Sequence, residues 1–285
     1  MVNIKKLSDY NFKTIYNTYV IAEIGINHNG DLKTAIDIVK SAAKTGCDAV
    51  KFQTYISEKR APKKKNKELY DILKKCELSF SDFTEIKRCC DEYDIEFIST
   101  AFDEESINFL NDINMNIFKI SSFDLINHKL LKKIASLNKT NIISVGMGNK
   151  KEIAEAYNIL SSNKNTKNAI LHCISSYPTP VESAKLASIN YLKNEYDNCI
   201  IGQSDHTPGI IVPAYAVAAG AQIIEKHYKI NTEMNCIDSI VSITEEEMTN
   251  LVKEIRNIEK IFGNAKEDVL EIEKGSLQYR RSNIL

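Results

Sequence analysis

The chain has 285 residues, of which 43% are hydrophobic and 26% are charged, and its formal net charge is −1. This composition is typical of a globular protein, and the balanced charge argues against nucleic acid or a membrane surface as a partner. No apolar run reaches the ~18 residues of a membrane helix, and seven cysteines stand in no framework spacing. With no leader-like apolar segment at the start, we expect a cytoplasmic protein with reduced thiols.

Apolar runs alternate with helical patterns eight times along the chain. We predict strands near residues 19–24, 48–53, 95–100, 116–121, 141–146, 168–174, 199–204 and 222–228. Helices are predicted near residues 31–45, 79–93, 104–112, 127–138, 150–161, 184–194, 209–219 and 244–262. The strand runs are apolar on both faces, and no G-x-G-x-x-G motif opens a helix. The pattern therefore favours a closed α/β barrel of the (β/α)8 TIM type over an open doubly wound sheet.

We expect one barrel domain over residues 1–263 and a polar C-terminal tail over residues 264–285. The residues before the first strand are expected to form a short hairpin that plugs the bottom of the barrel. Residues 56–78 form a long, basic connection after the second strand. It is either a solvated, mobile loop or an electropositive lid that attracts a phosphorylated substrate. Its cations include Lys59, Arg60, Lys63, Lys64, Lys65 and Lys67.

Polar and charged side chains stand at the end of every predicted strand. In chain order they are Glu23, Lys51, Gln53, Thr100, Lys119, Ser122, Asp124, Ser144, Ser175, Tyr177, Ser204, His206 and His227. The carboxyl ends of barrel strands meet at one face, so these residues predict an active site there.

Lys51 and Lys119 are unusual because a lysine in a buried strand is costly unless it is paired or bound to a ligand. Two of them at one barrel mouth suggest an anionic ligand between them, surrounded by the hydroxyl groups of the neighbouring strands. This composition suits a phosphate together with a carboxylate. The alternative is that each lysine pairs with an adjacent acid such as Glu23 or Glu225.

His206 and His227 close adjacent predicted strands, so their rings could share one divalent metal and leave positions open for water and substrate. Asp205 and Asp238 are acids that we expect near this metal. His28, in the first loop, either contacts substrate or caps the following helix. His172 lies earlier in its strand and is expected inside the barrel, as part of the packed core.

Seven ordered segments together resemble the sialic acid (N-acetylneuraminate) synthase family, which condenses phosphoenolpyruvate with an amino sugar. The matching segments are Ile-Ala-Glu23-Ile-Gly-Ile-Asn-His-Asn-Gly, Asp-Ala-Val-Lys51-Phe-Gln53-Thr, Ile-Ser-Thr100-Ala-Phe102-Asp, Phe-Lys119-Ile-Ser-Ser122, Leu-His-Cys-Ile-Ser-Ser-Tyr177-Pro, Ser204-Asp205-His206-Thr and Glu225-Lys226-His227.

The resemblance implies a role for each residue at the mouth. Phosphoenolpyruvate would be held by Lys51, Gln53, Thr100, Lys119, Ser122, Ser144, Ser175 and Ser204. A divalent metal, usually manganese in this family and with Mg²⁺ or Co²⁺ as alternatives, would sit on His206 and His227. Glu23, Tyr177 and Asp238 would face the sugar, and Phe102 is a further substrate-binding residue. The implied reaction joins phosphoenolpyruvate to an N-acetylmannosamine-type sugar and releases phosphate by C–O cleavage.

Three departures from the family pattern leave the acceptor open. Phe123 and Asp124 stand where Gly-Glu is typical, and that carboxylate is implied to handle the attacking water; Ser175 replaces a common asparagine. The family also implies a homodimer in which a C-terminal antifreeze-like domain contributes an arginine to the partner's sugar site. Since this sequence ends at Leu285, we expect that contact to be absent or to come from a separate chain.

The sequence is also consistent with three alternative functions. A synthase of the same family could serve a legionaminate, pseudaminate or spore-coat polysaccharide pathway. An aldolase could use Lys119 or Lys51 to form a Schiff base. A non-catalytic barrel subunit could depend on a partner chain.

Overall fold

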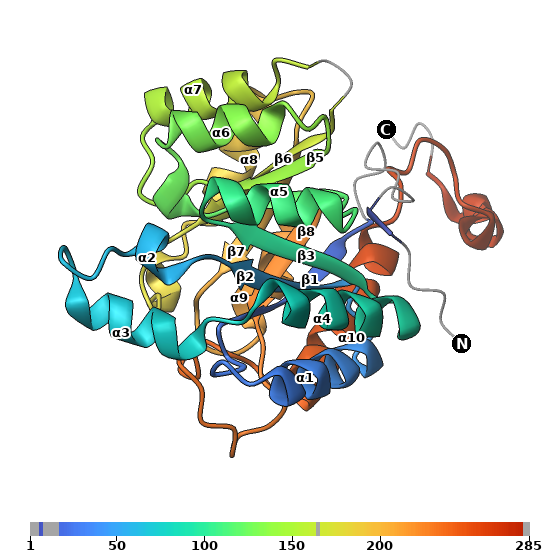
Figure 1. Ribbon diagram of the computed structural model, residues 1–285. Coiled ribbons are helices and arrows are strands. Elements are labelled where there is room, and N and C mark those ends of the chain that lie inside the picture. The colour runs from blue at the N-terminus through green and yellow to red at the C-terminus, as the bar shows by residue number, and fades with distance from the viewer. Residues whose placement is uncertain (1–5, 8–16, 164–165, 282–285) are drawn as a thin grey trace.

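The computed structural model describes residues 6–7, 17–163 and 166–281 (Figure 1). Eight parallel strands form a closed barrel in sequence order, which confirms the predicted TIM barrel. The strands are β1 Tyr19–Gly25, β2 Ala49–Thr54, β3 Glu96–Ala101, β4 Ile117–Ile120, β5 Thr140–Ser144, β6 Asn168–Cys173, β7 Ile200–Asp205 and β8 Ile223–His227. Every strand overlaps its predicted range.

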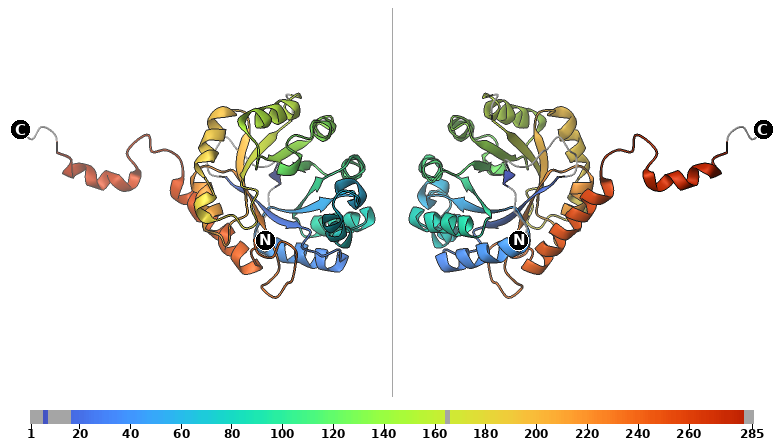
Figure 2. Two further views of the ribbon diagram at one scale, coloured as in Figure 1. Left: turned by 90° about the vertical axis from the view of Figure 1, so that its left-hand side faces the viewer. Right: turned by 90° about the vertical axis from the view of Figure 1, so that its right-hand side faces the viewer.

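Helices surround this ring of strands, as the two views of Figure 2 show. They are α1 Leu32–Lys44, α2 Ser57–Arg60, α3 Lys67–Cys76, α4 Phe80–Glu92, α5 Glu104–Asp112, α6 His128–Ala135, α7 Lys150–Leu160, α8 Ala187–Glu195, α9 Ile211–Ala218 and α10 Glu245–Phe262. Reciprocal capping boxes begin α4, α7 and α10 and satisfy backbone N–H groups that would otherwise lack partners. Short 3₁₀ helices follow at η2 Ser122–Asp124, η3 Val181–Ser183 and η4 Glu271–Tyr279.

Alternate residues of each strand point into the barrel. Toward the amino ends of the strands these residues are apolar and form a lower layer, and toward the carboxyl ends they are polar and form an upper layer. The apolar part is one cluster of Leu7, Tyr19, Ile21, Ala49, Ile98, Ile117, Ile142, Ala169, Leu171, Ile200 and Ile223. Leu7 closes this end, and its backbone N–H donates to Glu96 Oε2 at 2.9 Å. The predicted hairpin before β1 lies largely outside the described residues.

The segment 56–78 differs from one of its two sequence interpretations. It contains α2 and α3, so the segment is not the loop that this interpretation expected, although its lysines are exposed to solvent as expected. Asn66 caps α3 by accepting from Leu69 N, and Leu73 and Cys76 are buried on one face of the helix. The sequence contains the helical pattern, because Leu69, Ile72 and Leu73 stand at i, i+3 and i+4. The many lysines around these residues favoured the interpretation as a solvated loop.

The last described segment, 264–281, is largely exposed, and η4 lies apart from the barrel in Figure 2. Within the described residues, no helix combines the length and the apolar character that crossing a bilayer requires.

Candidate active site

The polar upper layer of the barrel interior is built by strand register. Glu23 on β1 is level with Lys51 on β2 and with His227 on β8. Thr100 on β3 is level with Gln53 on one side and Lys119 on the other. Hydrogen bonding between neighbouring strands therefore brings residues far apart in sequence to the same height at the carboxyl end of the barrel, where TIM-barrel chemistry takes place.

A cavity of about 300 Å³ opens at this end. Of the predicted site residues, those lining it are Glu23, Lys51, Gln53, Thr100, Phe102, Lys119, Ser122, Ser144, Tyr177, Ser204, His206, His227 and Asp238. The structure thus gathers all but two of the predicted site residues around one space.

Two lysines and two glutamates form a buried ionic cluster at the floor of this cavity. Lys51 Nζ lies 2.8 Å from Glu23 Oε2 and 3.8 Å from Glu225 Oε2, and Lys119 Nζ lies 3.7 Å from Glu225 Oε1. Both lysines therefore pair with acids, as the alternative interpretation expected. They also face one shared cavity, as an anion site requires.

Hydroxyl groups complete the floor. Lys119 Nζ donates to Ser144 Oγ at 2.7 Å, and Lys51 Nζ donates to Thr100 Oγ1 at 3.2 Å. Ser204 Oγ donates to Glu225 Oε1 at 2.8 Å. These groups hydrogen-bond one another, and this pairing limits the free-energy cost of keeping the charges buried. A ligand that binds here must replace some of these hydrogen bonds with its own.

Burial and neighbouring charges shift the pKa values of Glu23 and Glu225 in opposite directions. Burial raises the pKa of Glu23 to about 7, against the opposing effect of Lys51. Burial acts on Glu225 in the same sense, but Lys119 and Lys51 outweigh it and hold the pKa of Glu225 below its usual value. Glu23 can therefore carry a proton near neutrality while Glu225 stays ionised.

The lysines also differ. Burial lowers the pKa of Lys119, with Glu225 only partly opposing the effect. For Lys51 the carboxylates Glu225 and Glu23 together overcome burial, and its pKa is raised. Lys51 is thus the more firmly charged of the two.

The two histidine rings lie side by side, with centroids 5.4 Å apart. His206 Nδ1 donates to the carbonyl oxygen of Ile174 at 2.8 Å, which fixes the tautomer and leaves Nε2 with a free lone pair. Burial holds the pKa of His227 well below its usual value, and the neighbouring His206 adds to this. Both rings are therefore suited to act as neutral ligands.

These residues fit a divalent metal. His227 Nδ1 is buried, has no hydrogen-bond partner among the described residues, and lies 3.6 Å from Asp238 Oδ2. Across the described ranges, no group of three or more His, Cys, Asp or Glu side chains forms a preassembled metal site. A metal held here would accordingly take its other ligands from water and substrate.

Two predicted site residues do not line the cavity. Asp124, in η2, accepts hydrogen bonds from Asn127 Nδ2 at 3.0 Å and Ser121 Oγ at 3.2 Å. Ser175 is absent from the cavity lining, and a Cβ placed on Gly146 would approach its Oγ to 2.3 Å. In both cases the chain has left the strand, so alternation no longer controls where the side chain points.

Two further sequence interpretations were wrong. Asp205, the last residue of β7, faces away from the cavity because it follows the inward-pointing Ser204, and its Oδ2 lies 2.7 Å from Lys226 Nζ. His28 neither lines the cavity nor caps α1, since the cap is Asp31, and His28 Nδ1 instead accepts from Gly30 N at 3.1 Å. His172 is buried, which confirms its core position, but the expectation that it lies inside the barrel is wrong. It alternates with Leu171 of the interior cluster and therefore points outward, where its Nε2 lies 2.7 Å from Ala184 O.

The cavity also contains residues that sequence reasoning did not place in the site. Arg60, from α2, reaches in and donates to Gln53 Oε1 at 2.8 Å. Leu69 and Ile72 from α3, and Ile237 from the segment after β8, form apolar parts of its wall. Glu225, which the sequence suggested only as a partner for the lysines, also lines the cavity, because it lies two residues before His227 and points to the same face of β8.

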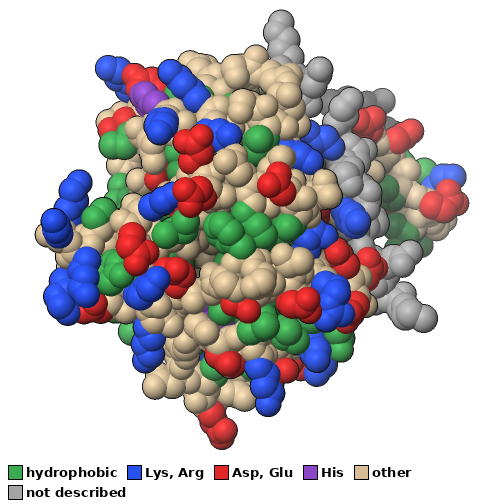
Figure 3. Space-filling model, in the orientation of Figure 1, with side chains coloured by type: hydrophobic (Ala, Val, Ile, Leu, Met, Phe, Trp, Pro, Cys, Tyr) green, Lys and Arg blue, Asp and Glu red, His purple; other side chains and the backbone are tan. Residues whose placement is uncertain are grey.

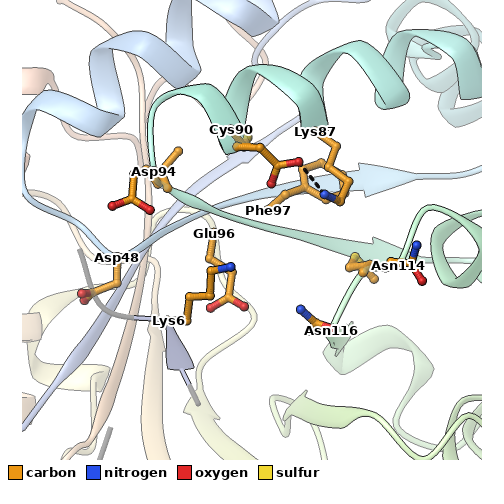
Figure 4. A pocket seen from close by; sticks show the side chains of 12 residues that line it. Lys6, Asp48, Lys87, Cys90, Asp94, Glu96, Phe97, Asn114 and Asn116 are labelled. Carbon is orange, nitrogen blue, oxygen red and sulfur yellow. Dashed lines mark hydrogen bonds and ion pairs between the residues drawn. The ribbon is translucent and has the colours of Figure 1, made fainter. Parts of the chain in front are cut away.

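A second cavity of about 330 Å³ lies at the opposite end of the barrel (Figure 4). Its lining includes Asp48, Glu96 and Asn116, near the amino ends of β2, β3 and β4, and an ion pair between Lys87 and Asp91 at 2.7 Å. Residues at this end of a TIM barrel serve stability rather than chemistry. The carboxyl-end cavity is therefore the candidate active site.

Comparison with known proteins agrees with this geometry. The NeuB family model matches residues 38–267. An uncharacterised protein of Methanocaldococcus jannaschii is 41% identical over 94% of this chain and 79% of its own length. N,N'-diacetyllegionaminic acid synthase of Campylobacter jejuni is 36% identical over 94% of this chain and 84% of its length.

Among solved structures, the N-acetylneuraminic acid synthetase of Leptospira borgpetersenii, in complex with citrate, is 37% identical with a TM-score of 0.89. The match covers 93% of this chain and 92% of that one. The resemblance drawn from the strand-end motifs is thus confirmed, and this chain belongs to the NeuB family, that of the sialic acid synthases and their relatives.

Proposed function

We propose that this protein condenses phosphoenolpyruvate with an N-acetylmannosamine-type amino sugar to give a nonulosonate and phosphate. The observation that carries the proposal is the single cavity that joins Lys51, Lys119 and a ring of hydroxyl groups to a pair of neutral imidazoles. The first set suits a ligand with phosphate and carboxylate groups, and the second suits a metal that binds a carbonyl oxygen.

The reaction divides between these two halves. C3 of phosphoenolpyruvate forms a bond to the aldehyde carbon of the open-chain sugar, whose oxygen takes up a proton and becomes a hydroxyl group. The C2=C3 double bond supplies the electron pair for this bond, and water adds to C2 and gives up one proton. The C2–O bond to the phosphoryl group then breaks, while the new C2 hydroxyl group becomes the ketone and its proton leaves with phosphate. A metal held by His206 and His227 would polarise the aldehyde.

The chain's own residues supply binding and proton transfer. Lys51 and Lys119 hold the phosphate and carboxylate groups, while Thr100, Ser144 and Ser204 offer fixed hydrogen bonds to charge that develops during the reaction. Glu23, with a pKa of about 7, can deliver or accept one of the two protons at neutral pH.

The proposal extends to the identity of the acceptor sugar and of the metal. The 36% identity to a diacetyllegionaminic acid synthase supports a legionaminate-type acceptor as the principal alternative, with pseudaminate-type and spore-coat sugars behind it. We propose Mn²⁺ as the metal, with Mg²⁺ and Co²⁺ as alternatives, and a cytoplasmic homodimer as the working form, with or without a separate C-terminal-domain chain.

The test is phosphate release from phosphoenolpyruvate in the presence of each metal and a panel of acceptors. The panel contains N-acetylmannosamine, its 2,4-diacetamido-6-deoxy relatives and arabinose 5-phosphate. With phosphoenolpyruvate labelled by ¹⁸O at the bridging oxygen, C–O cleavage leaves the label in phosphate. No release with any acceptor, even with a C-terminal domain supplied separately, would favour the non-catalytic subunit instead.

A further inference from the structure

Arg60 is the one cation of the 56–78 segment that lines the cavity. Its guanidinium carbon lies 3.6 Å from the centre of the Phe102 ring and 4.7 Å from that of Tyr55. Its Nη1 donates to Gln53 Oε1 at 2.8 Å. Stacking and this single bond fix the plane of the group and leave further N–H donors for a ligand.

No carboxylate among the described residues lies within ion-pairing distance of Arg60, in contrast to Lys51 and Lys119. Acidic groups act on it only from farther away, chiefly Asp124 and Asp238. Burial lowers its pKa to about 10, so it remains charged at neutral pH. The Arg60 guanidinium is therefore held in a fixed position in the cavity. Its charge is balanced only by distant carboxylates, and it has N–H donors left for a ligand.

An apolar wall stands beside this donor. Leu69 and Ile72 are 42% and 37% exposed on α3, and both line the cavity one helical turn apart. Leu73 continues the wall and is buried. Exposed apolar side chains that border a binding cavity are typical of surfaces covered by ligand.

We infer that Arg60 and this α3 wall form a subsite for the N-acyl group of the acceptor sugar. The guanidinium donates to the acyl carbonyl oxygen, and Leu69 and Ile72 pack against the acyl methyl group. The assignment rests on the proposed function, because it presupposes an amino-sugar acceptor. It makes the segment between β2 and α4 the part of the chain that distinguishes acylated from unacylated sugars.

A phosphorylated acceptor fits the same place less well. The other basic side chains of the segment, among them Lys63, Lys64, Lys65 and Lys67, do not line the cavity. They are exposed on the outer surface around α3, where Figure 3 shows blue side chains gathered at the left of the molecule. A single guanidinium group beside apolar side chains suits a neutral carbonyl oxygen better than a phosphate dianion. The dianion would have to lose its hydration there.

The test compares N-acetylmannosamine, its 6-phosphate and mannose in wild type and Arg60→Met, by phosphate-release kinetics and by ligand-observed NMR titration in the presence of phosphoenolpyruvate. Met keeps an unbranched side chain over Phe102 but removes the donors. We expect the KM and Kd for N-acetylmannosamine to rise about tenfold or more, because a hydrogen bond to a charged group is lost. Those for mannose and the KM for phosphoenolpyruvate should change less than about twofold.

Two further variants sharpen the result. Lys64→Met removes an exposed cation of the same segment that does not line the cavity, and it should behave as wild type. Ile72→Ser should weaken N-acetylmannosamine but not mannose, because only the acyl methyl group packs on this wall. Arg60→Lys should restore only part of the preference, since lysine lacks the planar fork.

The outcomes separate the two proposals. If wild type turns over acceptors but Arg60→Met keeps the full preference for the acylated sugar, the subsite assignment is wrong and the synthase proposal stands. A selective loss of N-acetylmannosamine 6-phosphate affinity, or a raised KM for phosphoenolpyruvate, would instead make Arg60 a phosphate ligand and would also overturn the assignment. Wild type that neither binds nor converts any acylated sugar would overturn both proposals.

Discussion

Replacing Lys119 by Met tests whether the buried ionic cluster is an anion site. Lys119 is 2% exposed, and its Nζ bonds Ser144 Oγ at 2.7 Å and Ile120 O at 3.1 Å. Methionine fills nearly the same volume, so the packing around the strand should survive. The substitution therefore removes a charge and few packing contacts.

The expected size of the effect follows from the charges that remain. The wild-type floor has two lysines facing two glutamates, whereas the variant leaves Lys51 alone with Glu23 and Glu225. An incoming anion loses a partner at contact distance and meets an excess of negative charge. At an effective dielectric constant near 20, one such contact is worth about 2–4 kcal/mol, or about 30- to 1000-fold in affinity.

The measurement is the Kd of phosphoenolpyruvate by titration calorimetry, with the KM values for phosphoenolpyruvate and acceptor from phosphate release. The KM for the acceptor should change by less than about threefold. Lys193→Met is the matched control, because Lys193 is half-buried far from the cavity and contacts Gly220 O at 3.4 Å. An unchanged phosphoenolpyruvate Kd in a folded Lys119→Met protein would remove this lysine from the anion site.

The remaining predictions concern the metal, the proton and the lysines as nucleophiles. His206→Ala and His227→Ala should each abolish metal-dependent turnover while the circular dichroism spectrum stays native, and full wild-type activity after EDTA would contradict the metal assignment. Burial raises the pKa of Glu23 from 4.5 to about 7, so the native state binds more protons than the unfolded state between these values. Its contribution to the free energy of unfolding is present below about pH 4.5 and is lost as pH rises through 7, and it is on the order of 1–3 kcal/mol. In urea unfolding measured over this pH range, Glu23→Gln should make stability depend less steeply on pH than in wild type. Equal pH dependence in the two proteins would refute the raised pKa. Borohydride with pyruvate should leave Lys119 and Lys51 unmodified by mass spectrometry, since a synthase forms no Schiff base, and an adduct on either lysine would favour the aldolase.

The sequence determined the barrel and most of the residues that line its mouth. Strand-end residues such as Lys51, Thr100 and Ser204 could be identified because their strands run apolar up to a polar carboxyl end, and a closed parallel barrel brings such ends together. His206 and His227 followed from the same rule. Local periodicity carries this information, so it needs no knowledge of packing.

Only the tertiary structure decided which side chains beyond the strand ends line the cavity. Asp124 and Ser175 lie beyond the ends of β4 and β6, where strand alternation no longer dictates where a side chain points, and neither lines the cavity. Ser122 and Tyr177 lie beyond the same two strands and do line it. Arg60 lies seven residues beyond Gln53 and returns to it only because α2 folds back over the mouth. The pairing of the buried lysines with Glu23 and Glu225, and the proton that burial leaves on Glu23, likewise depend on distances across the barrel that only the closed fold defines.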